Sequence, residues 1–148
     1  MNLKIRPAGN QDMNRIVKIL TDNHLPVEDI AEEKVQLFAG VIDDRIVASI
    51  GLEDHEKYGL LRSLAVDSDY KNRKIGDKLI KYLLDYVKIK GINALYLLTT
   101  TADKYFEKQG FCRLCRMQVP DRIKQTKQFK DICPDSAIVM FKETTSDQ

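Results

Sequence analysis

The chain of 148 residues lacks the features that mark membrane, exported and nucleic-acid-binding proteins. No apolar run approaches the ~18 residues that a membrane-spanning helix needs, and the N-terminus has no signal-peptide apolar stretch. Three cysteines are an odd number, which favours free thiols in a reducing cytoplasm over a disulfide framework. The formal net charge of +2 is too small to indicate a nucleic-acid partner. We therefore expect a cytoplasmic protein that binds neither nucleic acid nor membrane.

Metal-ligand patterns are also scarce. The two histidines, His24 and His55, belong to no recognisable triad. Cys112 and Cys115 are separated by two residues, but on a strand this spacing puts their side chains on opposite faces, and a second pair is missing. We therefore predict no metal site and interpret these two cysteines and Cys133 as buried or inert thiols, with capture of arsenite by the thiols as the alternative.

Composition and patterning predict one ordinary globular domain. Apolar residues make up 43% and charged residues 31%, and we expect a single domain over 1–142 followed by a polar tail, 143–148. The strands are predicted around Leu3 and Ile5 and at 35–42, 45–52, 60–66, 94–99, 113–119 and 137–141. The helices are predicted around Met13, Ile16, Val17 and Leu20 and at 75–90 and 102–109, with a short acidic helix at 27–33 and an irregular helix at 120–132.

The connections between these elements predict the topology. Asp43 and Asp44 indicate a hairpin, residues 53–57 a polar turn, and Thr100 with Asp103 a capping box. The long helix between the strands 60–66 and 94–99 requires a right-handed parallel crossover. We therefore predict a mixed α/β sheet, mostly antiparallel with one parallel β-α-β step, with helices on both faces.

The stretch from Arg62 to Gly76 is the most informative part of the chain. It is typical of a strand, a short basic loop and the beginning of an amphipathic helix. A helix N-terminus offers unpaired backbone N–H groups and a partial positive charge, and Lys71, Arg73 and Lys74 add full charges. The pattern therefore indicates a site for a phosphate or pyrophosphate, although a solvated basic helix start would look the same.

The order of the elements, this basic loop and the residues Ala102 and Phe106–Phe111 resemble the GNAT superfamily of acetyl-coenzyme A-dependent N-acetyltransferases. The family's pyrophosphate loop, a basic residue or glutamine followed by x-x-Gly-x-Gly/Ala, falls on Lys71–Gly76, with Lys74 in place of the middle glycine. Gly51–Glu53, Leu60–Val66, Leu95–Ala102 and Cys133–Ala137 further resemble the arsenic-resistance N-acetyltransferase-like branch.

The resemblance implies a set of contacts for acetyl-coenzyme A. Backbone groups of Leu64, Ala65 and Val66 would pair with the pantetheine arm. The pyrophosphate would lie on the loop and helix start formed by Lys71, Asn72, Arg73, Lys74, Ile75, Gly76 and Asp77, while Thr100 and Phe106 complete the cofactor contacts. If the loop requires positive φ at Lys74, the side chain there costs about 1–2 kcal/mol.

For the acceptor, we predict Arg62, Ser63 and Thr99 as substrate-binding residues. Because Arg62 lies in an apolar strand, it is either part of a structural ion pair or a clamp for an anionic substrate group. Helix capping is the default explanation of Thr99. The irregular segments 24–33 and 118–133 are the predicted substrate walls.

Catalysis would need a base for the acceptor amine and an acid for the departing thiolate. Glu53 is the candidate base, and the alternative is a solvated glutamate at a strand end. Many family members have a tyrosine where this chain has Phe106, so Tyr105 is the candidate acid, unless it packs or faces solvent. The thiol, with a pKa of about 8.5 by analogy with cysteine, is a tolerable leaving group without an acid.

The sequence therefore predicts an enzyme that moves an acetyl group from acetyl-coenzyme A to the amine of a small amino-acid-like molecule, with a link to arsenical resistance. We expect a monomer or homodimer. The alternatives are a catalytically degenerate acyl-coenzyme A-binding or regulatory domain, motivated by Lys74 and Phe106, and a thiol-based arsenite-binding protein, motivated by the cysteines.

Overall fold

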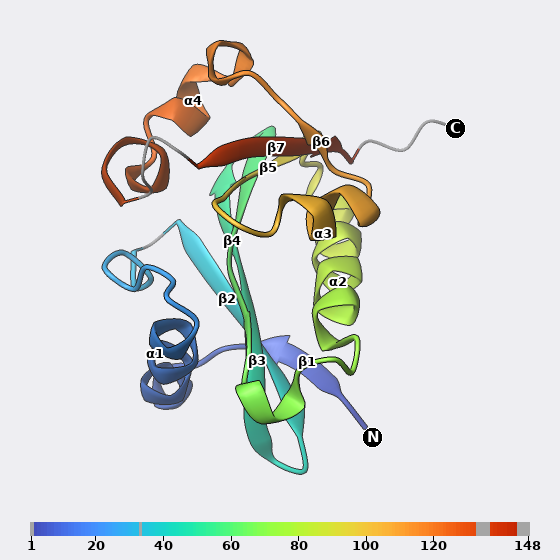
Figure 1. Ribbon diagram of the computed structural model, residues 1–148. Coiled ribbons are helices and arrows are strands. Elements are labelled where there is room, and N and C mark those ends of the chain that lie inside the picture. Colours follow the sequence, from blue (N-terminus) through green and yellow to red (C-terminus); the bar gives the residue numbers. More distant parts are fainter. Residues whose placement is uncertain (1, 33, 133–136, 145–148) are drawn as a thin grey trace. The chain divides into compact units, whose positions relative to one another are not determined.

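The computed structural model describes residues 2–32, 34–132 and 137–144 (Figure 1). Its seven strands are β1 (Lys4–Pro7), β2 (Val35–Ile42), β3 (Arg45–His55), β4 (Tyr58–Val66), β5 (Ala94–Thr99), β6 (Cys112–Arg113) and β7 (Ile138–Glu143). Its α-helices are α1 (Met13–Asp22), α2 (Ile75–Lys90), α3 (Asp103–Lys108) and α4 (Asp121–Lys124). Short 3-10 helices lie at Asn10–Asp12, Ser68–Tyr70 and Arg116–Gln118, and a π-helix at Gln128–Ile132.

The strands form one sheet in the order β1-β2-β3-β4-β5-β7-β6. β4 and β5 are parallel, in register from Tyr58 opposite Ala94 to Leu60 opposite Tyr96. The pairs β1–β2, β2–β3, β5–β7 and β6–β7 are antiparallel. The parallel pair is joined by α2, as a crossover requires, and the predicted mixed α/β sheet with one parallel step is confirmed.

The chain separates into two compact units, which we describe one at a time. The first contains the residues up to Glu53 together with Arg62–Leu83. The second contains Asp54–Leu61 together with the described residues from Leu84 onward.

In the first unit, β2 carries a helix on each of its faces, because successive side chains of a strand point to opposite sides. Leu37 and Ala39 join a buried cluster with α1, to which the helix contributes Ile16, Ile19 and Leu20. Phe38, from the other face, meets Tyr82 of α2 edge to face, with ring centroids 5.2 Å apart. The apolar periodicity of α1 and β2 thus fixes which sides they bury.

Two hairpin turns connect the strands of this sheet. Asp43 and Asp44 both have positive φ, 50° and 63°, as a two-residue type I′ turn demands, so the predicted hairpin is confirmed. The predicted polar turn at 53–57 is too long, because β3 continues to His55 and only Glu56 and Lys57 lie between the strands. Glu56, with φ 68°, makes the tight reversal.

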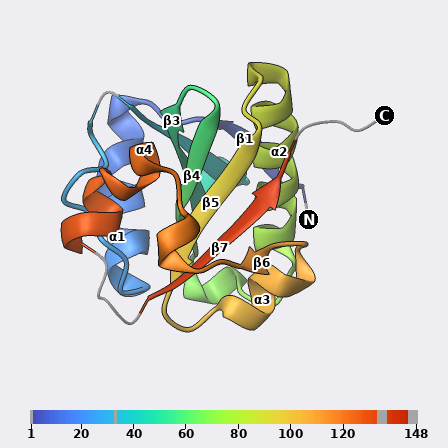
Figure 2. The ribbon, with the colours of Figure 1, turned by 90° about the horizontal axis from the view of Figure 1, so that it is seen from above.

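In the second unit, β5 and β7 run side by side with β6 at the edge (Figure 2). Tyr96 of β5 lies between two other rings, 6.1 Å from Tyr58 and 5.9 Å from Phe141, measured between centroids. Val119 and Ile123 pack on the same cluster, which places the irregular segment around α4 against this face. The predicted irregular helix at 120–132 therefore appears as α4 followed by the π-helix.

Three local predictions are wrong. Residues 28–32 form successive turns instead of an acidic helix, and Asp29 there is buried in an ion pair. The strand predicted at 113–119 ends at Arg113. The chain turns there because Nη2 of Arg116 donates a hydrogen bond to the carbonyl of Ala137 at 2.9 Å and its guanidinium lies over the Phe129 ring. α3 begins after Ala102 with no side-chain cap, so the predicted capping box of Thr100 and Asp103 is not formed.

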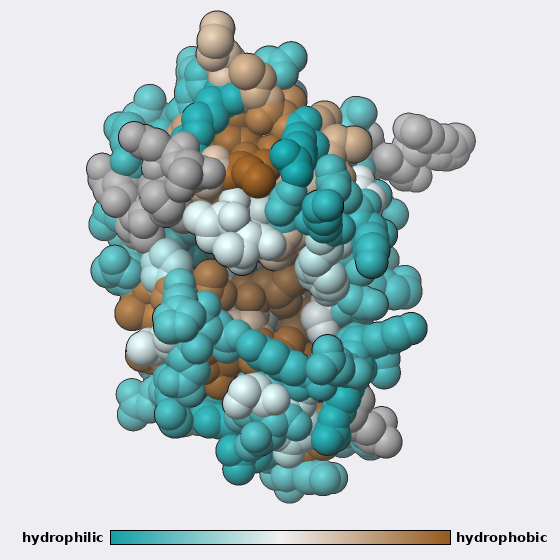
Figure 3. Space-filling model, viewed as in Figure 1, coloured by the Kyte–Doolittle hydropathy of each residue, from teal (hydrophilic) through white to brown (hydrophobic). Residues whose placement is uncertain are grey.

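Within the described ranges, no helix is both long enough and apolar enough to cross a membrane. Hydrophilic side chains cover most of the face that Figure 3 shows, and hydrophobic side chains appear on it in separate patches.

Candidate functional site

The guanidinium of Arg62 in β4 is the centre of a buried charged cluster in the first unit. Its two terminal nitrogens hold both oxygens of Asp29, Nη1 to Oδ2 at 2.7 Å and Nη2 to Oδ1 at 2.5 Å. Nη1 also donates to Oε2 of Glu53 at 3.0 Å, and Nε donates to the hydroxyl of Ser63 at 3.2 Å. Arg62, Asp29 and Glu53 are only 4%, 3% and 7% exposed, so all three are removed from bulk water.

These contacts determine the ionisation of Arg62. Burial alone would lower its pKa, but the hydrogen bonds and charge of Asp29, with those of Glu53, outweigh burial and raise the pKa above its ordinary value. The guanidinium therefore stays charged. Of the two sequence interpretations of Arg62, the ion pair is the one that these contacts form, and binding of a substrate anion stays a prediction.

Glu53 lies near the end of β3, opposite Val35 of β2. Its side chain is buried against Arg62, so the interpretation as a solvated strand-end glutamate is wrong. The alternation of β3 explains this, because Glu53 and its neighbour Asp54 point to opposite faces. The hydrogen bond from Arg62 holds the buried carboxylate of Glu53 in one orientation, as a proton-accepting group requires.

The end of β4 carries the residues predicted to pair with pantetheine. Ser63 has φ 57°, an unusual value inside a strand, and its carbonyl accepts a hydrogen bond from the buried Ser49 hydroxyl at 2.8 Å. Beyond it, Ala65 packs in the α1 cluster, and the carbonyl of Val66 accepts a hydrogen bond from the amide of Asn23 at 3.2 Å. Leu64 is half-buried.

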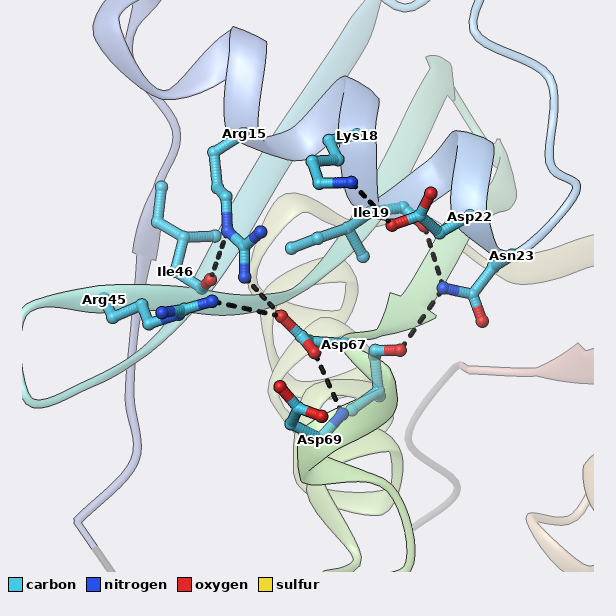
Figure 4. Close-up of polar contacts among 10 residues, drawn as sticks. Arg15, Lys18, Ile19, Asp22, Asn23, Arg45, Ile46, Asp67 and Asp69 are labelled. Atoms are coloured by element: carbon cyan, nitrogen blue, oxygen red, sulfur yellow. Dashed lines mark hydrogen bonds and ion pairs between the residues drawn. The ribbon is translucent and has the colours of Figure 1, made fainter.

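The loop that follows β4 is tied down by Asp67 (Figure 4). Arg15 of α1 donates to Asp67 and, through Nε, to the carbonyl of Ile46 at 3.0 Å. Arg45 adds a weaker ion pair at 3.8 Å, and the backbone N–H of Asp67 donates to the carbonyl of Val47 at 2.7 Å. α1 and the β2–β3 hairpin therefore both hold the start of the loop.

Asp67 also caps the 3-10 helix that it begins, accepting the N–H of Asp69 at 2.9 Å. That hydrogen bond is the largest influence on its carboxyl group. With Arg15 and Arg45 it holds the pKa of Asp67 below its usual range, against the opposing effect of partial burial.

The predicted phosphate loop has two residues in the left-handed region. Asn72 has φ 67° and Lys74 has φ 58°, so Lys74 adopts the positive φ that a glycine accommodates without cost. Ile75 is buried at the start of α2, while Lys71, Arg73 and Lys74 are exposed, with Arg73 5.1 Å from the centroid of the Tyr70 ring. A surface hollow of about 410 Å³ opens beside the loop, between Lys71, Ser68 and the end of α1.

The remaining predicted residues belong to the second unit. The hydroxyl of Thr99 accepts the N–H of Ala102 at 3.0 Å, so Thr99 supports the turn before α3, and Thr100 is exposed. Tyr105 is half-buried and meets Phe106 edge to face at 5.4 Å, while Phe106 is buried against Phe111. Their predicted roles toward cofactor and thiolate stay predictions.

The cysteines differ from expectation. Cys112 and Cys115 are free and exposed, so burial is wrong for these two, and their inertness stays a prediction. Cys133 lies outside the described residues. In the part of the chain that the structure describes, no group of three or more His, Cys, Asp or Glu side chains is arranged to hold a metal ion.

Sequence reasoning missed Asp29, Arg15 and Asp67. Asp29 is 33 positions from its partner Arg62, and Arg15 is 52 positions from Asp67, so no local pattern connects them. The one available signal was the charge of Arg62 within an apolar strand, which required a carboxylate from elsewhere in the chain.

The family model described as "Acetyltransferase (GNAT) family" matches residues 11–111. The probable N-acetyltransferase camello of Xenopus tropicalis is 27% identical over 104 residues, covering 66% of this chain and 48% of that protein. The amino-acid acetyltransferase of Pseudomonas fluorescens is 24% identical over 121 residues, covering 73% and 27%. The chain thus spans about half or less of the length of these curated relatives.

Solved structures share the fold. N-acetylglutamate synthase from Neisseria gonorrhoeae, complexed with coenzyme A and N-acetyl-glutamate, superposes with a TM-score of 0.82 at 16% identity, covering 97% of this chain and 35% of that one. A GNAT-family acetyltransferase from Staphylococcus aureus superposes with a TM-score of 0.79 at 18% identity, covering 97% and 99%.

The lowered pKa of Asp67 predicts an acid-sensitive contribution to stability. Because the carboxyl pKa is lower in the folded than in the unfolded chain, the contribution is complete above the unfolded value of about 3.9 and is lost as the pH falls through the folded value. We expect Asp67→Asn to lower the free energy of unfolding by about 1–3 kcal/mol at pH 7, with the difference from wild type shrinking below about pH 4. Urea unfolding at several pH values measures this, with Asp69→Asn, an exposed side chain in the same turn, as control. A difference that stays constant down to pH 2 would contradict it.

The positive φ of Lys74 predicts that a glycine there stabilises the fold. Lys74→Gly should raise the free energy of unfolding by about 1 kcal/mol, because it relieves the left-handed strain. Lys71→Gly is the matched control, since Lys71 has φ −68° and gains nothing from glycine. Equal effects of the two substitutions in chemical denaturation would mean that Lys74 is unstrained.

Proposed function

The chain belongs to the acetyltransferase (GNAT) family, and from this premise we propose that it transfers an acetyl group from acetyl-coenzyme A to the amine of a small amino-acid-like molecule. The observation that carries the proposal is the basic loop at the beginning of α2, where Asn72 and Lys74 turn the backbone through the left-handed region. The relatives of this chain include amino-acid acetyltransferases, which supports the reaction class.

The loop is suited to the pyrophosphate of coenzyme A. α2 is 16 residues long, so its N-terminus directs unpaired N–H groups and a partial positive charge toward the loop. Arg73, Ile75, Gly76 and Asp77 would present backbone N–H groups, and Lys71 would add charge from the rim of the adjoining hollow. In this proposal Leu64–Val66 bind the pantetheine arm, and Thr100 and Phe106 contact the cofactor.

The reaction requires a neutral amine, whereas most amines are protonated at pH 7. We assign removal of that proton to Glu53, whose carboxylate is held by Arg62. The amine nitrogen then attacks the thioester carbonyl, a C–N bond forms, and the C–S bond breaks to release coenzyme A thiolate. The nitrogen loses its second proton to water as the neutral amide forms. Tyr105 is the proposed donor of the proton that the thiolate takes up, with Arg62, Ser63 and Thr99 orienting the acceptor.

A narrower proposal concerns the acceptor. The resemblance of Leu60–Val66 and Leu95–Ala102 to the arsenic-resistance branch supports an amino-acid-like organoarsenical, or a compound that mimics one, as substrate in the cytoplasm. An acyl-coenzyme A-binding domain without turnover is the second candidate, favoured by Phe106 at the position where a tyrosine acid is expected. The two differ in whether any amine is acetylated once coenzyme A is bound.

Coenzyme A binding is tested by calorimetry on the wild type and Gly76→Asp. An aspartate in the first turn of α2 suits the helix dipole, so the variant should fold, but its charge repels the pyrophosphate. We expect micromolar binding by the wild type and a loss of about tenfold or more in the variant. Asn14→Asp, which adds the same charge on the exposed side of α1, should bind as the wild type does. Unchanged binding by Gly76→Asp would exclude this loop as the site.

The role of Glu53 is tested by Glu53→Gln. Loss of the base should lower kcat by about 10²–10⁴-fold at pH 7, with the Kd of coenzyme A unchanged, because the amide keeps the shape but accepts no proton. Asp54→Asn, a neighbour on the opposite face of β3, should retain activity. Turnover of Glu53→Gln equal to wild type from pH 6 to 9 would remove Glu53 from the role.

A further inference from the structure

Arg62 has almost no hydrogen-bonding capacity left for a substrate. A guanidinium has five N–H donors. Four are used within the protein: two by Asp29, one by Glu53 and one by Ser63. The single N–H that remains is on Nη2 and cannot bind a carboxylate bidentately. A carboxylate from outside would therefore have to replace one that the chain itself supplies.

Asp29 is the carboxylate that such a molecule would replace. It makes the bidentate contact, whereas Glu53 accepts only one hydrogen bond from Arg62. Asp29 also comes from a segment of turns, 28–32, and not from a strand of the sheet. Ile30, buried in the α1 cluster, anchors this segment beside it. Ile30 thus fixes the segment by an apolar contact, and Arg62 binds the carboxylate of Asp29.

The position of Glu53 directs an acceptor toward the same guanidinium. Glu53 and Asp29 both accept hydrogen bonds from Nη1 of Arg62, so their carboxylates are adjacent. In an α-amino acid a single carbon separates the amine from the carboxylate. An amine that gives its proton to Glu53 would therefore bring its carboxylate within reach of Arg62, where Asp29 already lies. This step rests on the proposed function of Glu53 as the base.

We propose that Asp29 competes with the carboxylate of the acceptor for Arg62, and so determines how well amines that carry a neighbouring carboxylate are accepted. Two carboxylates, Asp29 and Glu53, already pair with the guanidinium of Arg62, and their negative charge opposes the approach of a third carboxylate. Asp29 is a specificity-determining residue in this account, and its removal opens the bidentate face of Arg62.

Binding of a free carboxylate tests the competition without turnover. Asp29→Ala leaves a carboxylate-sized space beside Arg62, and the probe is sodium formate at constant ionic strength, with the thermal midpoint of the coenzyme A-free protein as readout. We expect formate to raise the thermal midpoint of Asp29→Ala by several degrees. The thermal midpoint should stay constant in the three controls, which are the wild type, Glu28→Ala and Asp29→Ala/Arg62→Met. Glu28 is an exposed carboxylate on the same segment. No response of Asp29→Ala, or an equal response of the wild type, would overturn the proposal.

Kinetic selectivity gives the second readout, using glycine with glycinamide and L-methionine with L-methioninamide as acceptors. In Asp29→Asn, which keeps the shape and is the variant of choice if Asp29→Ala does not fold, the ratio of kcat/KM for acid over amide should rise about tenfold. The ratio should not change in Asp85→Asn, which alters an exposed carboxylate of α2 outside the predicted site. An unchanged ratio in Asp29→Asn would show that Asp29 is structural only. Absence of turnover with every amine would instead contradict the proposed acetyl transfer, and the formate titration would still decide the competition.

Discussion

The buried charge of Arg62 is the constraint on which the rest of the first unit depends. A guanidinium that is 4% exposed is tolerated only when carboxylates surround it, because an unpaired buried charge is very unfavourable. The pairing brings the turns around Asp29, 33 positions from Arg62 in the sequence, against the hairpin of β3 and β4, which supplies Glu53 and Arg62. Removing one partner from a buried pair of this kind typically costs about 3–5 kcal/mol, so the cluster also fixes the orientation of the candidate base.

A second set of charges holds the basic loop between β4 and α2. Asp67 is connected to α1 through Arg15 and to the β2–β3 hairpin through Arg45 and its own backbone, so the loop begins from a fixed point. From there the chain passes through two left-handed residues into α2. A lysine kept at φ 58° where glycine would be unstrained is the kind of local cost that functional sites retain. The strain and the anchoring together favour a loop shaped for a ligand.

Local patterns in the sequence predicted what depends on local physics. The hairpin at Asp43 and Asp44, the helix from Ile75 to Lys90 and the parallel crossover follow from turn chemistry, apolar spacing and connection length. Positive φ at Lys74 was stated only as a condition, on the strength of the family's loop pattern, and the structure has φ 58° there. These features involve residues that are neighbours in sequence, or whose placement the chain connection enforces.

Two of the failures involve partners that are distant in sequence, and a third is a local shift of one residue. Asp29 was assigned to an acidic helix because nothing nearby shows that its side chain belongs to Arg62. The strand expected at 113–119 is ended by contacts of Arg116 with Ala137 and Phe129, which follow it in the chain. The turn before α3 is supported by Thr99 and not by Thr100, a shift of one residue that depends on how β5 ends. The candidate base could be named from the sequence, but not the pair of charges that orients it.

The most direct test of this account is a nuclear magnetic resonance titration of the isotope-labelled protein with coenzyme A, followed at each backbone amide. If the loop and the end of β4 form the cofactor site, the largest shifts should fall on Arg73–Asp77 and Leu64–Val66. Shifts confined to the hollow around His55 and Arg122 in the second unit, or no shifts at all, would contradict the assignment of the cofactor to the loop at the beginning of α2.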